Sequence, residues 1–338
     1  TSVSQWEGAD FGNSAMDIDP ENVESVSLLK GANAAALYGS RAANGVVLIT
    51  TKSGQKGTSK GIGVSFSTAT QFDNVYILPN YQDKYGQGYG GSEYQAKASG
   101  IDVSDVAAYE AWARENAFSY YDGNWGGVMD GIDESWGPRL DIGMNIPQFN
   151  SPVDPDGSNR EATPWVSNPD NVKDIFETGI TQDNNLSLVA GTDKAAARLS
   201  LSRQAIKGAI PNTDLKKYTV NFNGSMELSK RLSAQATVNY TQNQSDNLPG
   251  GGYDENNIMQ SVGGWFGRQV DMAPLEEKWD ELDVFGEPYN WNRSYHNNVF
   301  WTLNKNTTSR DRKRMFGNFS LTYQLTDWLS AMGRVGTD

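Results

Sequence analysis

The sequence contains no cysteine and a single histidine, His296, among its 338 residues. The chain therefore has neither a disulfide framework nor thiolate metal ligands, and it lacks the donors of most zinc sites and of cysteine–histidine catalysis. It also has no run of about 18 apolar residues, which excludes a transmembrane helix. Transmembrane strands remain open, because about ten alternating residues suffice for each and leave the mean hydropathy low.

Positive charge is also scarce. The chain carries 28 Lys and Arg residues against 41 Asp and Glu residues, a net charge of −13 at pH 7. This balance repels nucleic acid, and no local basic patch offsets it, so we predict no nucleic-acid partner. By length alone the chain could hold about two domains.

The most informative stretch is residues 17–52, DIDPENVESVSLLKGANAAALYGSRAANGVVLITTK. Asp19 can accept the free N–H groups of a short helix that begins at Pro20, and Glu21 places a carboxylate at the positive end of that helix. Residues 26–29 then predict a short strand. The local signals thus predict a helix start followed directly by a strand.

The second half of this stretch predicts a helix, a turn and a strand. The helix runs from Asn33 to Tyr38 and ends at Gly39, and Asn44-Gly45 form the turn. Residues 46–49 are apolar without alternation, which is typical of a strand buried on both faces. Few amphipathic helices are available to cover such a strand, so another structure is expected to enclose it.

Most of the remaining chain shows apolar residues alternating with polar ones at a period of two, the pattern of half-buried strands. Seven segments carry it: 62–72, 186–190, 197–201, 218–228, 232–240, 315–325 and 329–335. Their central apolar faces contain no Lys or Arg, which would cost roughly 2–4 kcal/mol at the middle of a bilayer. Arg203 extends one such face toward its end and is a mild misfit.

The lengths of the connections depend on which end of the strands they join. The connections after the second, fourth and sixth strands are short, whereas the opposite end has two long loops, about 73–181 and 245–306, and a shorter one at 207–214. Short turns on one side and long loops on the other are typical of an outer-membrane barrel, and a soluble sandwich has no reason to show them.

Residues 28–52 resemble the later half of the plug domain of TonB-dependent outer-membrane transporters, in particular the SusC/RagA subgroup. This segment reads LLKGANAAALYGSRAANGVVLITTK. SWGPRLDIG, NPDNVKDIFETGIT, KGAIPNTDLKKYTVNFNGS, PGGGYDENN, GWFGRQVDM and NTTSRDRKRMFGNFSLTYQLTDWLS resemble the barrel of the same subgroup. The resemblance implies an all-β membrane barrel of about 22 antiparallel strands when complete, with a small α+β plug domain inside.

On this resemblance the chain is a fragment with about seven of the strands. Residues 1–53 are the C-terminal half of the plug, 54–61 a linker, and 62–338 the first part of the transmembrane barrel. The plug signature, with a structural or gating role, comprises Gly31, Tyr38, Gly39, Arg41, Asn44 and Gly45. Arg41 is expected to pair with a carboxylate of the barrel wall. The TonB-contacting segment and the first half of the plug are known only from the family.

Aromatic residues concentrate in the two long loops: Trp125, Trp136, Trp165, Trp265, Phe266, Trp279, Tyr289, Trp291, Tyr295 and Trp301. Exposed rings beside Asn and Asp can stack on sugar faces. The candidate contacts for ligand or lid are Trp136, Trp165, Trp265, Tyr289 and Trp291. For any single ring, packing within the loop or a girdle at the barrel rim is the favoured alternative.

Other motifs do not indicate catalysis or a cofactor. Gly86, Gly88 and Gly91 spell GxGxxG without the strand and helix that a dinucleotide site requires. The acidic stretches 122–134 and 154–157 lack the ligand spacing of an EF-hand. The loop carboxylates single out no glycosidase pair. We therefore predict no enzyme activity, no metal site and no cofactor.

The resemblance implies active import of an oligosaccharide or peptide nutrient across the outer membrane of a Gram-negative cell. The expected partners are a SusD-like surface lipoprotein, the TonB–ExbB–ExbD complex and outer-membrane lipid. Two alternatives remain open: a siderophore or cobalamin importer of the same architecture, and a soluble or surface-anchored β protein that binds or cleaves glycans.

Overall fold

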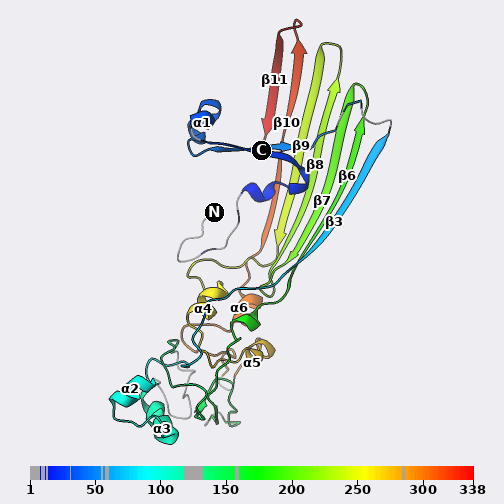
Figure 1. Ribbon diagram of the computed structural model, residues 1–338. Helices are drawn as coiled ribbons and strands as arrows, with labels where there is room; N and C mark the ends of the chain where they lie inside the picture. Colours follow the sequence, from blue (N-terminus) through cyan, green and yellow to red (C-terminus); the bar gives the residue numbers. More distant parts are fainter. Residues whose placement is uncertain are drawn as a thin grey trace.

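The computed structural model describes residues 8, 12, 14–30, 32–54, 56–57, 61–117, 132–156, 160–283 and 286–338. Its main body is a seven-stranded antiparallel sheet of order β11-β10-β9-β8-β7-β6-β3 (Figure 1). The strands are β3 (Ile62–Asp73), β6 (Gly179–Gly191), β7 (Ala195–Lys207), β8 (Asp214–Glu227), β9 (Leu232–Ser245), β10 (Arg310–Gln324) and β11 (Ser330–Thr337). All seven alternating segments are confirmed as strands of one sheet.

The connections are sorted by length as predicted. Three short turns, 192–194, 228–231 and 325–329, join strands at one end of the sheet. The two long loops, 74–178 and 246–309, and the short loop 208–213 lie at the other end, so the loops form a separate mass below the strands in Figure 1. We refer to these as the short-turn end and the loop end.

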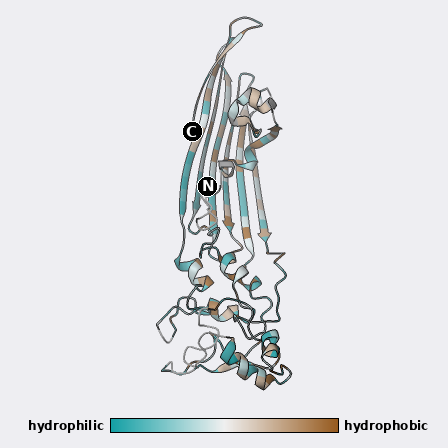
Figure 2. Ribbon diagram, turned by 90° about the vertical axis from the view of Figure 1, so that its left-hand side faces the viewer, coloured by the Kyte–Doolittle hydropathy of each residue, from teal (hydrophilic) through white to brown (hydrophobic). Residues whose placement is uncertain are grey.

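The two faces of the sheet differ in polarity, because hydrophobic and hydrophilic residues alternate along its strands (Figure 2). One face carries Leu201, Val220 and Phe222, which are exposed, whereas the other carries Ser200 and Asn221, which are buried. Because strand residues alternate between faces, the period-two sequence pattern produces this division directly. Exposing an apolar face to water is unfavourable, because of the hydrophobic effect. An apolar outer face is typical of a sheet that contacts the hydrocarbon of a membrane.

The N-terminal segment, residues 14–54, lies against the polar face of the sheet (Figure 1). Its elements are η1 (Ser14–Asp17), η2 (Pro20–Asn22), β1 (Val23–Leu29), α1 (Ala32–Tyr38), η3 (Ser40–Ala42) and β2 (Val46–Thr51). Asp19 caps η2 by accepting the Glu21 amide at 3.0 Å, and Gly39 ends α1 with a positive φ of 75°. The predicted order of helix, strand, helix, turn and strand is confirmed.

The predicted burial of residues 46–49 on both faces is wrong for this structure. β2 pairs only with β1, in an antiparallel two-stranded sheet. Val47 and Leu48, which point to opposite faces, are 58% and 42% exposed. The contacts between the N-terminal segment and the large sheet are mainly polar and lie near residues 16–22 and 51–52, so they cover neither face of this hairpin.

Gly45 occupies a backbone conformation that a side chain strains. Its φ is 104°, its amide donates to the Ala42 carbonyl at 2.9 Å, and a Cβ at this position would lie 3.0 Å from the Leu29 carbonyl oxygen. We expect Gly45→Val to destabilise the turn by about 1–3 kcal/mol and to lower the melting temperature of the full-length protein in detergent. Gly333→Val is the control, since a Cβ there meets no atom within 4 Å. Equal melting of both variants and wild type would refute this assignment.

The two long loops fold together. The first contains α2 (Glu93–Ala98), α3 (Val106–Asn116), β4 (Asn145–Pro147), β5 (Ala162–Pro164) and η4 (Lys173–Ile175), and the second contains α4 (Ile258–Gly264), α5 (Met272–Glu277) and α6 (Val299–Lys305). One hydrophobic core belongs to the first loop alone, and a second is shared by both loops. Within the described ranges no helix has the length and apolar content to cross a membrane.

Candidate functional site

The strongest contact between the N-terminal segment and the sheet centres on Asp17, whose side chain is fully buried. Its Oδ2 lies 2.9 Å from Arg314 Nη1 and 3.0 Å from Arg312 Nη2. Asn243 Nδ2 donates to Oδ1 at 3.0 Å, and Thr241 Oγ1 donates to the main-chain carbonyl of Asp17 at 3.2 Å. One carboxylate thus receives two guanidinium groups and an amide.

The strand register explains why these side chains converge. Arg312 is paired across strands with Asn243, and Arg314 with Thr241. Residues two apart on a strand share a face, so the four side chains all point to the polar face, one pleat apart. β9 and β10 therefore form a ready-made pocket for one carboxylate.

A second contact involves β7. Asp19 accepts the Nδ2 of Asn22 at 2.9 Å and the hydroxyl of Ser202. Arg198 Nη1 donates to Asn22 Oδ1 at 2.6 Å. Asp19, which caps the start of η2, and Asn22, its last residue, therefore also fasten η2 to the sheet.

Two side chains of β8 complete the interface by binding main-chain oxygens. Lys217 Nζ donates to the carbonyls of Met16 and Ile18 at 2.6 and 3.1 Å. Asn223 Nδ2 donates to Thr51 Oγ1 at 3.0 Å and to the Lys52 carbonyl at 3.3 Å. The N-terminal segment is thus held across four neighbouring strands, β7 to β10, by charged and polar groups.

Sequence reasoning identified Asp19 only as a helix cap and did not identify Asp17. The available signal was Arg312 and Arg314, two cations at the polar positions of one strand. Of the predicted plug residues, Gly31 and the Arg41 side chain lie outside the described residues, so the proposed Arg41 pair stays a prediction. Tyr38 is exposed, and Gly39, Asn44 and Gly45 lie at the end of α1 and in the turn.

Two of the five candidate aromatic residues have no free ring face. Trp165 and Trp291 are both 0% exposed. Trp165 donates its indole N–H to the Pro138 carbonyl at 3.0 Å, and Trp291 meets Phe266 edge to face, with centroids 4.9 Å apart. Loop packing, the favoured alternative, accounts for both rings, which corrects the expectation that they contact a ligand or lid.

The other three candidates are accessible to different degrees. Trp136 is 65% exposed, whereas Trp265 and Tyr289 are half-buried. Burial raises the pKa of Tyr289 to about 12. Trp136 is the aromatic side chain of this group best placed to stack on a ligand, and its role stays a prediction.

The single histidine joins the two long loops. His296 Nε2 lies 2.8 Å from Asp133 Oδ2, and its ring stacks on Trp291 with an interplanar angle of 11°. Ser261 Oγ lies 3.5 Å from Nδ1. This Ser–His–Asp order resembles a hydrolase triad, but the Ser261 residue and the His296 side chain are only 5% and 6% exposed. The arrangement is closed to a substrate and is best explained as a structural joint.

The GxGxxG motif also has a structural explanation. A Cβ at Gly86 would lie 2.2 Å from the Trp165 ring, and one at Gly88 would lie 2.6 Å from the Gly137 Cα. Between them, Gln87 exchanges two 2.9 Å hydrogen bonds with Gln269 of the other loop. The glycines therefore permit close packing of the loops and form no phosphate cradle. No cluster of three or more His, Cys, Asp or Glu side chains suited to a metal occurs in the described ranges.

An ion pair in the first loop provides a pH test. Arg139 Nη1 lies 2.6 Å from Glu93 Oε1 and holds the pKa of that carboxyl below its usual range. The pair therefore contributes stability above the unfolded pKa of Glu93, and this contribution is lost as the pH falls through the lower, folded pKa. We expect hydrogen exchange of α2 to accelerate on acidification below about pH 4, after correction for intrinsic rates. Glu93→Gln should exchange faster at neutral pH and lose the acid-dependent increase; an unchanged profile in that variant would exclude the pair as the cause.

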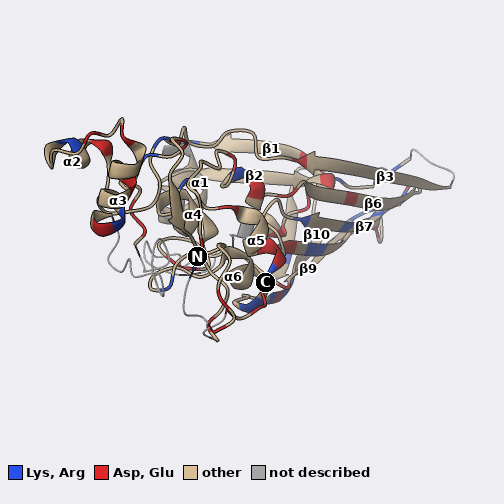
Figure 3. Ribbon diagram, turned by 90° about the horizontal axis from the view of Figure 1, so that it is seen from below, with Lys and Arg blue, Asp and Glu red and all other residues tan. Residues whose placement is uncertain are grey.

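Charge is distributed unevenly along the molecule. Loop 74–178 contains 17 acidic and 6 basic residues, and loop 246–309 contains 10 acidic and 4 basic residues. Acidic groups are spread over the loop end in the view of Figure 3. The net negative charge of the two loops together is larger than that of the whole chain. The rest of the chain therefore has a small net positive charge.

Comparison with known proteins agrees with this architecture. The TonB-dependent Receptor Plug Domain family matches residues 3–46. The TonB-dependent receptor SusC of Bacteroides thetaiotaomicron is 25% identical over 213 residues, 63% of this chain and 15% of that protein. The TonB-dependent receptor P39 of Formosa agariphila is 45% identical over 68 residues, 20% of this chain and 7% of that protein.

A solved structure shares the fold. The RagAB peptide importer in its closed-closed state matches 95% of this chain and 32% of its own chain, with a TM-score of 0.57 and 18% sequence identity. The chain therefore spans about a third of that relative's length and a smaller share of the curated relatives. Plug, sheet and sequence relatives together support a partial TonB-dependent barrel of the SusC/RagA type.

Proposed function

We propose that this chain, which belongs with the SusC/RagA-type TonB-dependent transporters, forms part of an importer that takes up an oligosaccharide or peptide nutrient across the outer membrane. The observation that carries the proposal is the N-terminal segment bound to the polar face of a sheet whose other face is apolar. A barrel closed from such a sheet has a polar lumen, and the N-terminal segment occupies it as a plug.

The interface between plug and sheet suits a reversible closure. Its described contacts are ion pairs and hydrogen bonds, and neither hydrophobic core of the described residues includes a residue of the N-terminal segment. Polar contacts can be exchanged for contacts with water when the plug moves, whereas a broad apolar contact would resist separation in water. Energy from a TonB complex, acting on the plug, would open the lumen, and a SusD-like lipoprotein would cover the loop end.

The charge of the loops narrows the substrate class. The two long loops, with 27 acidic and 10 basic residues, carry an excess of negative charge that repels polyanions more than neutral or cationic molecules. We therefore assign neutral oligosaccharides as the substrate class, with basic peptides as the second candidate. The exposed ring of Trp136 favours the sugar, because indole faces stack on sugar rings.

The test is uptake by a strain that lacks the native gene and expresses the full-length protein. Labelled neutral oligosaccharides, uronic-acid oligosaccharides, basic peptides and an iron–siderophore complex are supplied separately, with and without the TonB complex. We expect uptake of a neutral oligosaccharide or a basic peptide that requires TonB. Uptake of the iron chelate alone would overturn the substrate class, and recovery of the full-length protein in the soluble fraction would overturn the barrel.

A further inference from the structure

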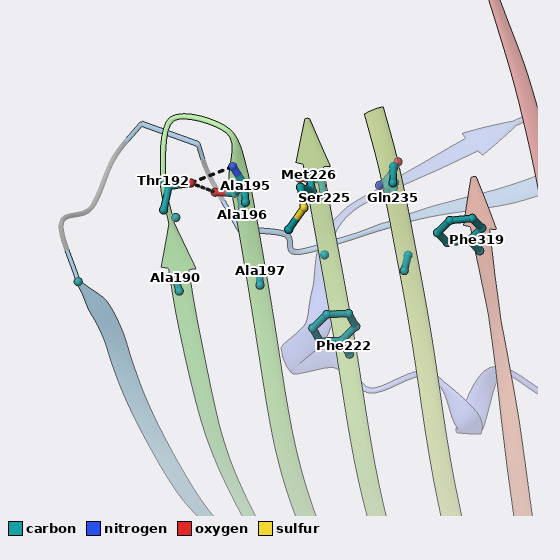
Figure 4. A pocket seen from close by; sticks show the side chains of 15 residues that line it. Ala190, Thr192, Ala195, Ala196, Ala197, Phe222, Ser225, Met226, Gln235 and Phe319 are labelled. Atoms are coloured by element: carbon teal, nitrogen blue, oxygen red, sulfur yellow. Dashed lines mark hydrogen bonds between the residues drawn. The ribbon is translucent and has the colours of Figure 1, made fainter. Parts of the chain in front are cut away.

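The apolar face of the sheet contains a groove near the short-turn end, with a volume of about 500 Å³ (Figure 4). The residues at its floor are cross-strand partners on neighbouring strands. Ala190 is paired with Ala197, Ala197 with Gly224, Gly224 with Ala236, and Ala236 with Phe319. One cross-strand row thus has four small residues side by side and a large ring at its end.

Larger side chains border this row. Phe222 precedes Gly224 on the same face, and its ring reaches to 2.8 Å from where a Gly224 Cβ would be. Met226 lies on the other side of the row, opposite Ala195 and Ala234. Neighbouring strands are spaced by 4.7–4.9 Å, so the small-residue floor from β6 to β9 runs roughly 14 Å across the sheet.

The three turns at the short-turn end, beside the groove, hold three basic and two acidic residues, a small excess of positive charge. Lys194 lies in the turn after β6, and Lys230 and Arg231 lie in the turn after β8; all three are exposed. Lys194 is three residues from Ala197, about 10 Å along an extended chain. Three acidic groups lie at the same end: Asp193 in the turn with Lys194, Asp327 in the turn after β10, and Glu227, which pairs with Lys56 at 2.7 Å. This end therefore has exposed cations next to an apolar groove, in contrast to the acidic loop end.

We propose that the groove binds an acyl chain of an anionic phospholipid whose phosphate lies among Lys194, Lys230 and Arg231. This inference rests on the proposed function, which places the sheet in the outer membrane. In that placement the short-turn end lies in the inner leaflet. The groove matches hydrocarbon because its lining is apolar, and the basic turns match the negative head group. A zwitterionic lipid would fill the groove equally but gain less from the turns.

The test uses the full-length transporter purified in detergent and exchanged into phosphatidylglycerol or phosphatidylethanolamine, with bound lipid counted by native mass spectrometry. We expect phosphatidylglycerol to be retained in preference to phosphatidylethanolamine. The double variant Ala197→Leu, Ala236→Leu fills the floor and should reduce retention at least about fivefold. The triple variant Lys194→Gln, Lys230→Gln, Arg231→Gln should retain both lipids equally.

Thr70→Leu is the matched control, since it adds a leucine to the same face of the sheet on β3, outside the groove. Heat-modifiable mobility on gels reports that each variant is folded. Unchanged lipid retention in the filled variant would overturn the proposal, as would a change of oligomeric state there, which would make the groove an interface between two copies. A protein that needs no detergent would instead refute the membrane placement itself.

Discussion

Replacing Asp17 by asparagine is expected to weaken the attachment of the plug to the sheet by about 2–4 kcal/mol. The side chain keeps its shape, but Arg312 and Arg314 lose their shared counter-charge at a buried position. The arginine side chains are themselves partly exposed, at 35% and 24%, so water recovers some of the loss. This is the largest effect we expect from any single polar group of the interface.

Two measurements report on this change in the full-length protein. Limited proteolysis should cleave the plug faster, and cells should admit a large antibiotic that the wild-type barrel excludes. Asp17→Glu restores the charge and should recover most of the protection. Wild-type rates of cleavage and entry in Asp17→Asn would show that the carboxylate does not hold the plug.

Trp291→Ala should destabilise the loop end by about 3–5 kcal/mol, the cost of deleting a large buried aromatic side chain. Trp291 is 0% exposed and packs on both His296 and Phe266 in the core shared by the two loops. Its removal leaves a cavity where the loops meet. We expect faster hydrogen exchange in α4 and α6 and loss of transport, while the strands stay protected.

Trp136→Ala is the matched comparison, because that ring is 65% exposed and deleting it opens no cavity. Its stability should change by less than about 0.5 kcal/mol. A loss of substrate affinity in Trp136→Ala with normal loop exchange would identify it as a ligand contact. Equal exchange in the two variants would contradict the structural role assigned to Trp291.

The parts of this fold that sequence could predict are those governed by local rules. Alternation at a period of two is a property of each strand alone, so β3 and β6 to β11 were recognisable one at a time. The cap at Asp19 and the stop at Gly39 depend on neighbours within four residues. Loop lengths follow from counting once the strands are known.

The candidate site depended on contacts between distant residues, which such rules do not reach. Asp17 and Arg312 are separated by 295 positions. The local sequence around an arginine on the polar face of a strand does not show whether that arginine pairs with a distant carboxylate. Trp165 and Trp291 were misjudged for a related reason: a polar, aromatic-rich loop was expected to be open, but these loops have hydrophobic cores of their own. Residues 46–49 were misjudged in the opposite direction: they were expected to be buried, but Val47 and Leu48 are exposed and the other two are half-buried.

The order of the plug contacts along the chain has a mechanical consequence. Asp17 binds β9 and β10, Asp19 and Asn22 bind β7, and Thr51 binds β8. A force applied to the chain on the N-terminal side of Asp17 would act on these contacts one after another, beginning with that of Asp17. The peak force is then set by the strongest single contact and not by their sum, so the Asp17 cluster determines how hard the plug must be pulled.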